Sequence, residues 1–232
     1  MAQQQKKKKS FSLHDFNNIK PKTYAQEEVF QYFSDYDVMS LLGAPGTGKS
    51  FISFYLAMRE AVKETTPYER VIVIRSTVPS REIGFLPGEH WEKEEPYFQY
   101  LDDIANEVFK YKTNNVKNLR TIGLLECISS SFLRSMTFDD AIVICEECQN
   151  YNFQELNTIM TRIGVNSKVM FVGDMNQNDL CYNKRDRSGF NDFYQILQSM
   201  DNHVSVQFRT DDIVRSGIVR DYIEAGIELG YF

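Results

Sequence analysis

The stretch Gly43-Ala44-Pro45-Gly46-Thr47-Gly48-Lys49-Ser50 decides what kind of fold this chain adopts. A strand-like run at 37–42 precedes it, and a helix-like run at 51–58 follows it. The pattern GxxxxGK[ST] between a strand and a helix is typical of a phosphate-binding loop. Its glycines let backbone N–H groups converge on an anion at the positive end of the helix dipole. The alternative is a glycine-rich turn that merely starts a helix.

Two side chains of this loop have separate expected roles. Lys49 is predicted to reach the β and γ phosphates of a nucleotide, and the Ser50 hydroxyl is predicted to ligate Mg²⁺. Neighbouring positions supply backbone contacts to the phosphates. The nucleotide-binding residues expected from the loop are Gly43, Ala44, Pro45, Gly46, Thr47, Gly48, Lys49, Ser50 and Phe51.

Length and composition indicate one buried α/β domain. The 232 residues suffice for a single core, so we expect a flexible basic tail at 1–20 and one domain at 21–232. The sequence has no run of about 18 apolar residues and no signal-peptide stretch, which predicts a cytoplasmic protein with no membrane partner. The net charge of −6 argues against a uniformly basic nucleic-acid surface but allows a local basic groove.

The four cysteines do not form two metal-spaced pairs. Cys145 and Cys148 have the spacing of half a zinc site, but no second pair or nearby histidine completes it. We therefore expect both to be buried beside the end of a strand, in a protein of a reducing compartment.

Short apolar runs alternate with amphipathic segments, which favours a parallel sheet covered on both faces by helices. The runs predicted to be strands are 38–42, 71–74, 119–128, 141–145 and 168–172. Helices are predicted at 24–33, 96–111, 153–163 capped by Asn152, and 212–229 capped by Asp211. Such sheets bind ligands at the carboxyl ends of their strands, so the phosphate loop, Glu146 and Asp174 should converge there.

Polar side chains follow two of the predicted strands. Glu146 is predicted to hold the metal ion, and Glu147 is predicted to act as general base on the attacking water. The alternative is a pair of solvated carboxylates at the start of a helix. Gln177 is predicted to hydrogen-bond the γ phosphate or the lytic water, with a polar surface turn as its alternative.

Taken together, these motifs resemble the PhoH family of ATPases, and the resemblance runs from about residue 21 to near the C-terminus. Beside the phosphate loop, it rests on RSTV at 75–78, GFLPG at 84–88, EECQN at 146–150, TRIG at 161–164, GDMNQND at 173–179 and DIVR at 212–215. A phage origin is the expectation here.

The resemblance implies an α/β fold: one RecA-like P-loop NTPase domain with a mostly parallel sheet flanked by helices, like the first domain of superfamily 1 helicases. ATP and Mg²⁺ are the ligands it implies. Gln26, just ahead of the first strand, is then expected to recognise adenine, and an exposed helix glutamine is the alternative. The family usually has Asp then Glu where this chain has Glu146 and Glu147, which points to slower hydrolysis because Mg²⁺ geometry is strict.

A single RecA-like domain lacks the arginine that a second domain supplies to the transferring phosphoryl group. We therefore predict a ring-like homo-oligomer, with a hexamer as the expected form, in which a neighbour supplies it. Arg215 is the leading candidate for this role, ahead of Arg209 and Arg162. A surface salt bridge and a role at its own site are the alternatives for Arg215.

The function implied is a Mg²⁺-dependent ATPase coupled to single-stranded nucleic acid, RNA rather than DNA, as a helicase-like motor or remodeller. Arg75 and Thr77 are candidates for the nucleic-acid path by analogy with the helicase motif after the second strand, or else are structural. A second hypothesis is a slow ATP-hydrolysing switch that regulates a protein partner. Nuclease activity is not expected, because the sequence shows no separate cluster of metal-binding carboxylates.

Overall fold

The computed structural model describes residues 11–76, 96–111, 115–130, 133, 136–174 and 189–230. The predictions made for Thr77, the GFLPG motif at 84–88 and Gln177 lie outside these residues. Within the described part of the chain, no helix combines the length and the hydropathy needed to span a bilayer.

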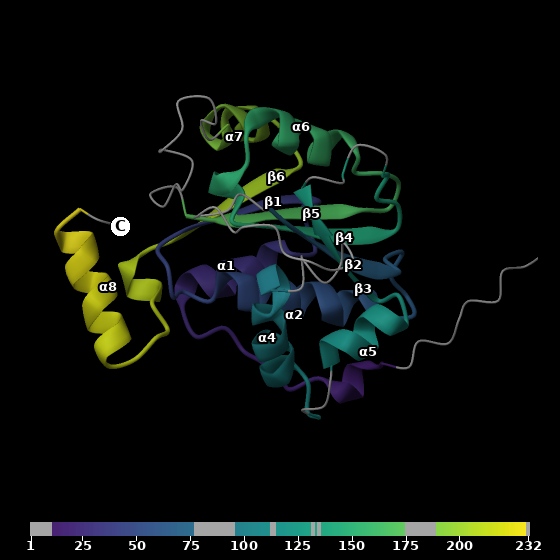
Figure 1. Ribbon diagram of the computed structural model, residues 1–232, viewed down its shortest axis with the longest axis horizontal. Helices are drawn as coiled ribbons and strands as arrows, with labels where there is room; N and C mark the ends of the chain where they lie inside the picture. Colours follow the sequence, from purple (N-terminus) through teal and green to yellow (C-terminus); the bar gives the residue numbers. More distant parts are fainter. Residues whose placement is uncertain are drawn as a thin grey trace, which may run out of the picture.

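A six-stranded sheet forms the centre of the molecule, in the order β3-β2-β4-β5-β1-β6, and every strand pair is parallel (Figure 1). The strands are β1 Val38–Gly43, β2 Arg70–Arg75, β3 Leu125–Ser129, β4 Ala141–Glu146, β5 Lys168–Gly173 and β6 His203–Phe208. The expected α/β architecture with a parallel sheet is confirmed. All carboxyl ends of the strands therefore point to one edge, where ligands of such sheets bind.

Helices cover both faces of the sheet, as the sequence predicted (Figure 1). One face carries α1, α2, α4 and α5, the other carries α6 and α7, and α8 stands beside the layers. Their bounds are α1 Tyr24–Tyr32, α2 Lys49–Ala61, α4 Tyr100–Val108, α5 Asn115–Thr121, α6 Phe153–Thr161, α7 Phe190–Gln198 and α8 Ile218–Glu228.

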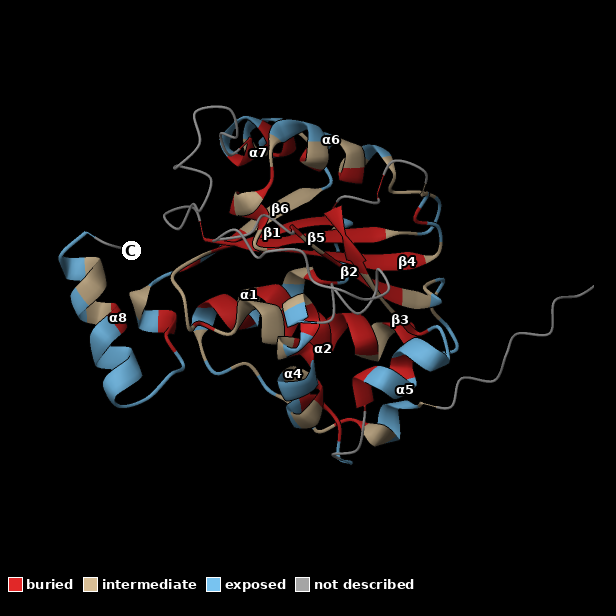
Figure 2. Cartoon of the chain, viewed as in Figure 1, coloured by how far each residue is buried: buried red, intermediate tan, exposed pale blue. Residues whose placement is uncertain are grey.

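The central strand β4 shows why the sheet is stable between these layers. Its Ile142 and Ile144 belong to the apolar cluster under α2, whereas Val143 and Cys145 belong to the cluster under α6 and α7. All four side chains are 0% exposed, and Figure 2 shows the strands buried between helices whose outer surfaces are exposed. Alternating side chains of β4 thus pack into two separate cores, one on each face of the sheet. Because both sets are buried, the run is continuously apolar in the sequence.

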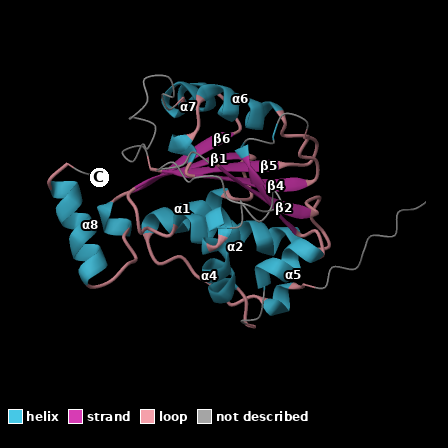
Figure 3. Ribbon diagram, in the orientation of Figure 1, coloured by secondary structure: helices cyan, strands magenta, loops and turns pink. Residues whose placement is uncertain are grey.

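Two predicted elements differ in the structure (Figure 3). The apolar run at 119–128 is the end of α5 followed by β3, because Gly123 takes a left-handed φ of +73° between them. The helix predicted at 212–229 starts only at Ile218. Asp211 is not its cap, since it lies in a separate 3₁₀ turn, Thr210–Asp212, and Gly217 occupies the N-cap position.

The remaining predicted helices are confirmed with shifted ends. Asn152 caps α6 as expected: its Oδ1 accepts from the Glu155 N–H at 3.0 Å, and Glu155 Oε2 accepts from the Asn152 N–H at 2.9 Å. The helix ends at Thr161 rather than at 163, and α4 covers Tyr100–Val108 of the predicted 96–111. Strand β6 and helix α7 were not predicted.

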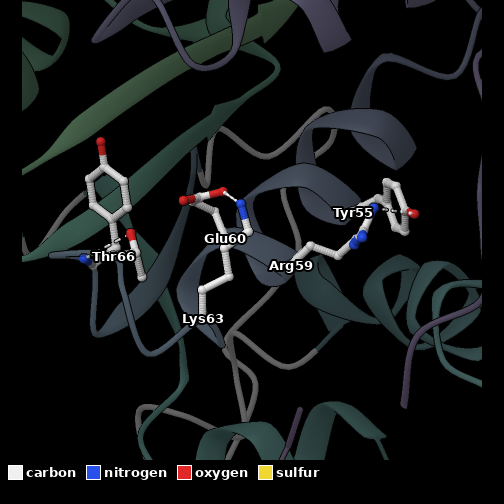
Figure 4. A network of polar contacts seen from close by, with 6 residues as sticks. Tyr55, Arg59, Glu60, Lys63 and Thr66 are labelled. Atoms are coloured by element: carbon white, nitrogen blue, oxygen red, sulfur yellow. Dashed lines mark hydrogen bonds and ion pairs between the residues drawn. The ribbon is translucent and has the colours of Figure 1, made fainter. Parts of the chain in front are cut away.

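Part of the predicted tail contacts the domain, since the Phe11 ring lies 5.2 Å from the Phe109 ring. The division into a tail at 1–20 and a domain at 21–232 stays a prediction. Phe16 is 4% exposed and pairs its backbone with Phe109. Tyr55 of α2 holds the next residues, because its hydroxyl accepts from the Ile19 N–H at 3.1 Å and from Arg59 Nη1 at 3.0 Å. Figure 4 shows Arg59 reaching Tyr55, beside the Lys63–Glu60 ion pair at the end of the same helix.

Candidate nucleotide-binding site

The phosphate-binding loop joins the end of β1 to the start of α2, as its sequence predicts. Its three glycines have left-handed φ values: +127° at Gly43, +74° at Gly46 and +82° at Gly48. A Cβ atom at Gly46 would lie 3.0 Å from Arg215 Cγ, and one at Gly48 would lie 3.0 Å from Gln26 Nε2. Glycine is therefore required here both for the backbone turn and for the neighbours that pack on it.

Replacing Gly43 by alanine is expected to destabilise the fold by more than about 4 kcal/mol, because its Cβ would lie 1.9 Å from the Phe208 carbonyl oxygen of β6. Gly123→Ala is the matched control: its φ of +73° is also left-handed, but its Cβ would meet nothing within 4 Å. That variant carries only the left-handed strain, about 1–2 kcal/mol. Urea unfolding of both variants measures the difference, and equal losses would contradict the steric argument.

Lys49 lies at the centre of the loop, half-buried. Its Nζ donates to the carbonyls of Gly43 and Ala44, each at 2.7 Å. Burial lowers the pKa of the Lys49 amine, and the nearby carboxylates of Asp174 and Glu147 oppose that shift. The amine is thus held inside the loop by hydrogen bonds to neutral carbonyl oxygens.

Ser50 and Glu146 meet at the junction of α2 and β4. The Ser50 hydroxyl donates to Glu146 Oε2 at 2.7 Å, and Glu146 is 4% exposed. Burial raises the pKa of Glu146 to about 7, while the hydrogen bond from Ser50 opposes that rise. A buried carboxylate with a raised pKa gains stability as the ion when a cation binds beside it.

This pair of oxygens fits Mg²⁺. Octahedral Mg²⁺ with bonds of 2.0–2.1 Å places adjacent ligand oxygens about 2.9 Å apart, close to the 2.7 Å between Ser50 Oγ and Glu146 Oε2. Among the described residues, no group of three or more His, Cys, Asp or Glu side chains could hold a metal ion by itself. Mg²⁺ commonly uses one or two protein oxygens and completes its shell with phosphate and water.

Glu147 and Gln149 follow β4 in a tight turn. Glu147 has a left-handed backbone, with φ 53° and ψ 48°, and its carboxylate accepts from Gln149 Nε2 at 2.6 Å. Gln149 Oε1 accepts from the Asp174 N–H at 3.1 Å, which ties the turn to the end of β5. The sequence contains Gln149 in its EECQN motif, but no role was predicted for it.

The expected convergence of loop, acids and strand ends is confirmed. One cavity of about 1170 Å³ is lined by the loop, by Glu146 and Glu147, and by Asp174. Residues 45–51 of the loop line it, whereas Gly43 and Ala44, whose carbonyls accept from Lys49, do not. Residues 18–22 and α4 form another part of its wall. The cavity is large enough for a nucleotide, whose phosphates would lie at the loop.

Gln26 is 3% exposed and also lines this cavity, so the alternative of an exposed helix glutamine is wrong. Its Nε2 donates to the Thr47 carbonyl at 2.9 Å, and its Oε1 accepts from the Lys22 N–H at 2.9 Å. Gln26 therefore joins α1 to the phosphate-binding loop. Its contact with adenine stays a prediction.

Arg215 lies at the cavity of its own chain. The preceding residue anchors it there, because the Val214 N–H donates to the Gly46 carbonyl at 3.0 Å. This placement is compatible with the alternative role at its own site, and the predicted role at a neighbour's site stays a prediction. Arg209 and Arg162 are not among the residues that line the described cavity.

Arg75 points toward α4. Its Nη1 donates to the Tyr97 carbonyl at 2.7 Å, and its guanidinium lies 5.0 Å from the centre of the Tyr100 ring. These contacts fit the structural alternative, and the place of Arg75 on a nucleic-acid path stays a prediction. Cys145 and Cys148 are both 0% exposed, as expected for packing beside a strand end.

A parallel sheet with a glycine-rich loop, a serine–carboxylate pair and a second acid at one edge defines a P-loop protein of RecA-like fold. The family model described as "PhoH-like protein" matches residues 18–226, and the chain belongs to this family. It is 32% identical over 211 residues to a PhoH-like protein of Bacillus subtilis (strain 168), covering 90% of this chain and 64% of that protein.

A PhoH-like protein of Mycobacterium leprae (strain TN) is 31% identical over 213 residues, covering 90% of this chain and 59% of that protein. The chain thus spans roughly six-tenths of the length of these relatives. Among solved structures, the large terminase from a thermophilic bacteriophage matches with a TM-score of 0.52 and 13% identity, covering 88% of this chain and 49% of that one. That likeness concerns the fold.

Proposed function

We propose that the protein binds ATP with Mg²⁺ and hydrolyses it. The observation that carries this proposal is the convergence of Lys49, the Ser50–Glu146 pair and Glu147 on one cavity at the carboxyl edge of the sheet. Family membership supports an ATPase-type function. The paired acids favour attack by water over transfer to a metabolite, because the second acid is available as a base.

The proposed mechanism assigns one task to each group. Lys49 exchanges the carbonyls of Gly43 and Ala44 for phosphate oxygens, and the loop N–H groups hold the remaining ones. Ser50 and Glu146 hold Mg²⁺, which supplies neutralising charge to the phosphates. Glu147 takes the proton of the attacking water.

Three further residues complete the proposed site. Arg215 is proposed to stabilise charge on the phosphates bound to its own chain, since it lies against its own loop. Gln26 is proposed to contact the adenine through its amide, which its position in the cavity wall allows. Gln177 keeps its proposed role at the γ phosphate.

We further propose that a homo-oligomer is the active form. Helix α8 supports this proposal, because it carries an exposed apolar stripe in which Ile218 is 86%, Tyr222 69% and Leu229 73% exposed. These residues are spaced by four and seven positions, so they lie on one face of the helix. A ring is the geometry in which a neighbour's arginine reaches the site, and Arg215, Arg209 and Arg162 are the candidates for this role.

Coupling to single-stranded RNA or DNA is the finer part of the proposal, and its support is the resemblance to a helicase domain. The competing proposal is a slow switch for a protein partner. One contact favours the switch: Ile223 of α8 lies against Gly46, since a Cβ there would be 3.1 Å from Ile223 Cδ1. A change in the loop when a nucleotide binds would therefore be transmitted through Ile223 to α8 and its exposed apolar stripe.

ATP turnover with and without single-stranded RNA and DNA tests the two proposals. We expect turnover to rise with single-stranded RNA and the rise to fall with salt, because phosphate contacts are screened. Duplex RNA of the same sequence is the control for charge alone. Turnover that is unchanged by every nucleic acid would contradict the coupling and favour the switch.

A further inference from the structure

Gln149 lies between the polar residues that follow β4 and those that follow β5. It lies in the 3₁₀ turn Cys148–Asn150 directly after β4, and its side chain is 3% exposed. Burial of an amide is unfavourable unless its donor and its acceptor both find partners. In this chain both do, and the two partners come from different strand ends.

The two hydrogen bonds fix the orientation of the amide. Nε2 donates to Glu147 Oε2 at 2.6 Å, and Oε1 accepts from the Asp174 N–H at 3.1 Å. A carboxylate accepts only and a backbone N–H donates only, so the reversed amide would satisfy neither partner.

Packing holds the amide in this place. A Cβ at Gly173 would lie 2.3 Å from Gln149 Oε1 and 2.6 Å from Cys148 Sγ, so β5 passes close beneath the turn. Cys148 itself is 0% exposed. The glycine therefore provides the space in which the Gln149 side chain lies.

The backbone conformation of Glu147 bears on how its carboxylate is held by Gln149. Its left-handed conformation, φ 53° and ψ 48°, is one that non-glycine residues rarely adopt without local support. The Asn150 N–H donates to the Glu147 carbonyl at 2.9 Å, which closes the turn. The turn thus directs the Glu147 carboxylate toward the cavity, and the Gln149 amide sets how the carboxylate is oriented there.

We propose that Gln149 is a positioning residue for hydrolysis, which holds the Glu147 carboxylate in the orientation that activates water and links it to the end of β5. This inference rests on the proposed function, because Glu147 must act as the base. Gln149 touches neither the nucleotide nor the water in this account. Its effect is transmitted through Glu147 alone, and orientation errors of about 1 Å at a reacting group cost on the order of 10²-fold in rate.

Gln149→Glu is the sharpest variant, because it keeps the length and the Oε1 acceptor but replaces the donor to Glu147 by a second carboxylate oxygen. We expect kcat for ATP to fall about 10- to 100-fold, with KM and the Kd for ATP unchanged within about twofold. Gln149→Leu removes both bonds at similar volume and should lower kcat similarly. Gln154→Glu, in an exposed position of α6, is the matched control and should leave kcat unchanged.

The double variant Glu147→Gln/Gln149→Glu separates positioning from a direct or merely structural role. If Gln149 acts through Glu147, the double variant should be no slower than Glu147→Gln alone. Losses that multiply, or a KM that rises with kcat unchanged, would overturn the inference. So would a Gln149→Glu enzyme as fast as the wild type when Glu147→Gln is slow. If Glu147→Gln itself leaves kcat unchanged, the base assigned in the proposed function fails, and this inference fails with it.

Discussion

Replacing Lys49 by alanine is expected to lower ATP affinity by at least about 100-fold and to abolish hydrolysis, while the protein stays folded. The Lys49 amine donates to two neutral carbonyls and not to a carboxylate, so its removal leaves no carboxylate without a hydrogen-bond partner. Burial also lowers the pKa of this amine, which means that its charge is not favoured by the fold itself. Binding of a fluorescent ATP analogue measures the affinity, and urea unfolding measures the stability.

Lys63→Ala is the matched control on the same helix region, because Lys63 is partly exposed and pairs with Glu60 only three residues away. It should bind ATP like the wild type, since a surface pair of this kind contributes at most about 1 kcal/mol to stability. If Lys49→Ala retained wild-type affinity, Lys49 would not hold the phosphates and the loop would be a structural turn.

Glu147→Gln is expected to lower kcat by roughly 10²- to 10⁴-fold with ATP binding intact. The amide keeps the size of the side chain but cannot take a proton from water, and it also loses the charged acceptor for Gln149. Single-turnover phosphate release at saturating ATP measures the chemical step directly.

Glu126→Gln serves as the control for this change. Glu126 forms a partly exposed ion pair with Arg70 on β3 and β2, away from the residues that line the cavity. Its loss should leave single-turnover rates unchanged. A Glu147→Gln protein that released phosphate as fast as the wild type would show that another group, or none, removes the proton.

Local patterns in the sequence were sufficient for the centre of the site. The phosphate-binding loop, the strand that ends at Glu146 and the Asn152 cap each depend on residues within a few positions of one another, and each is confirmed. Strand order follows no such local pattern. The sheet places β1 between β5 and β6, and β6 alternates polar and apolar residues from His203 to Phe208. This alternation is typical of a half-buried strand, so the signal was present in the sequence although no strand was predicted there.

Contacts between distant segments explain what the sequence did not predict. Gln26 is buried because Thr47, far along the chain, accepts its amide hydrogen bond. Asp212 does not start a helix because it is held by the Arg209 and Ala25 N–H groups instead. Arg215 then reaches its own loop, since the chain runs past Gly46 before α8 begins. Each outcome depends on tertiary contacts, which residue spacing alone does not specify.

Phosphate release from ATP by the purified protein, with Mg²⁺ and again after chelation of Mg²⁺, tests the central claim most directly. We expect release by the wild type with Mg²⁺, none after chelation, and none from Lys49→Ala under either condition. Equal release by the wild type and by Lys49→Ala would show that the reaction does not take place at the site formed by the loop, Glu146 and Glu147.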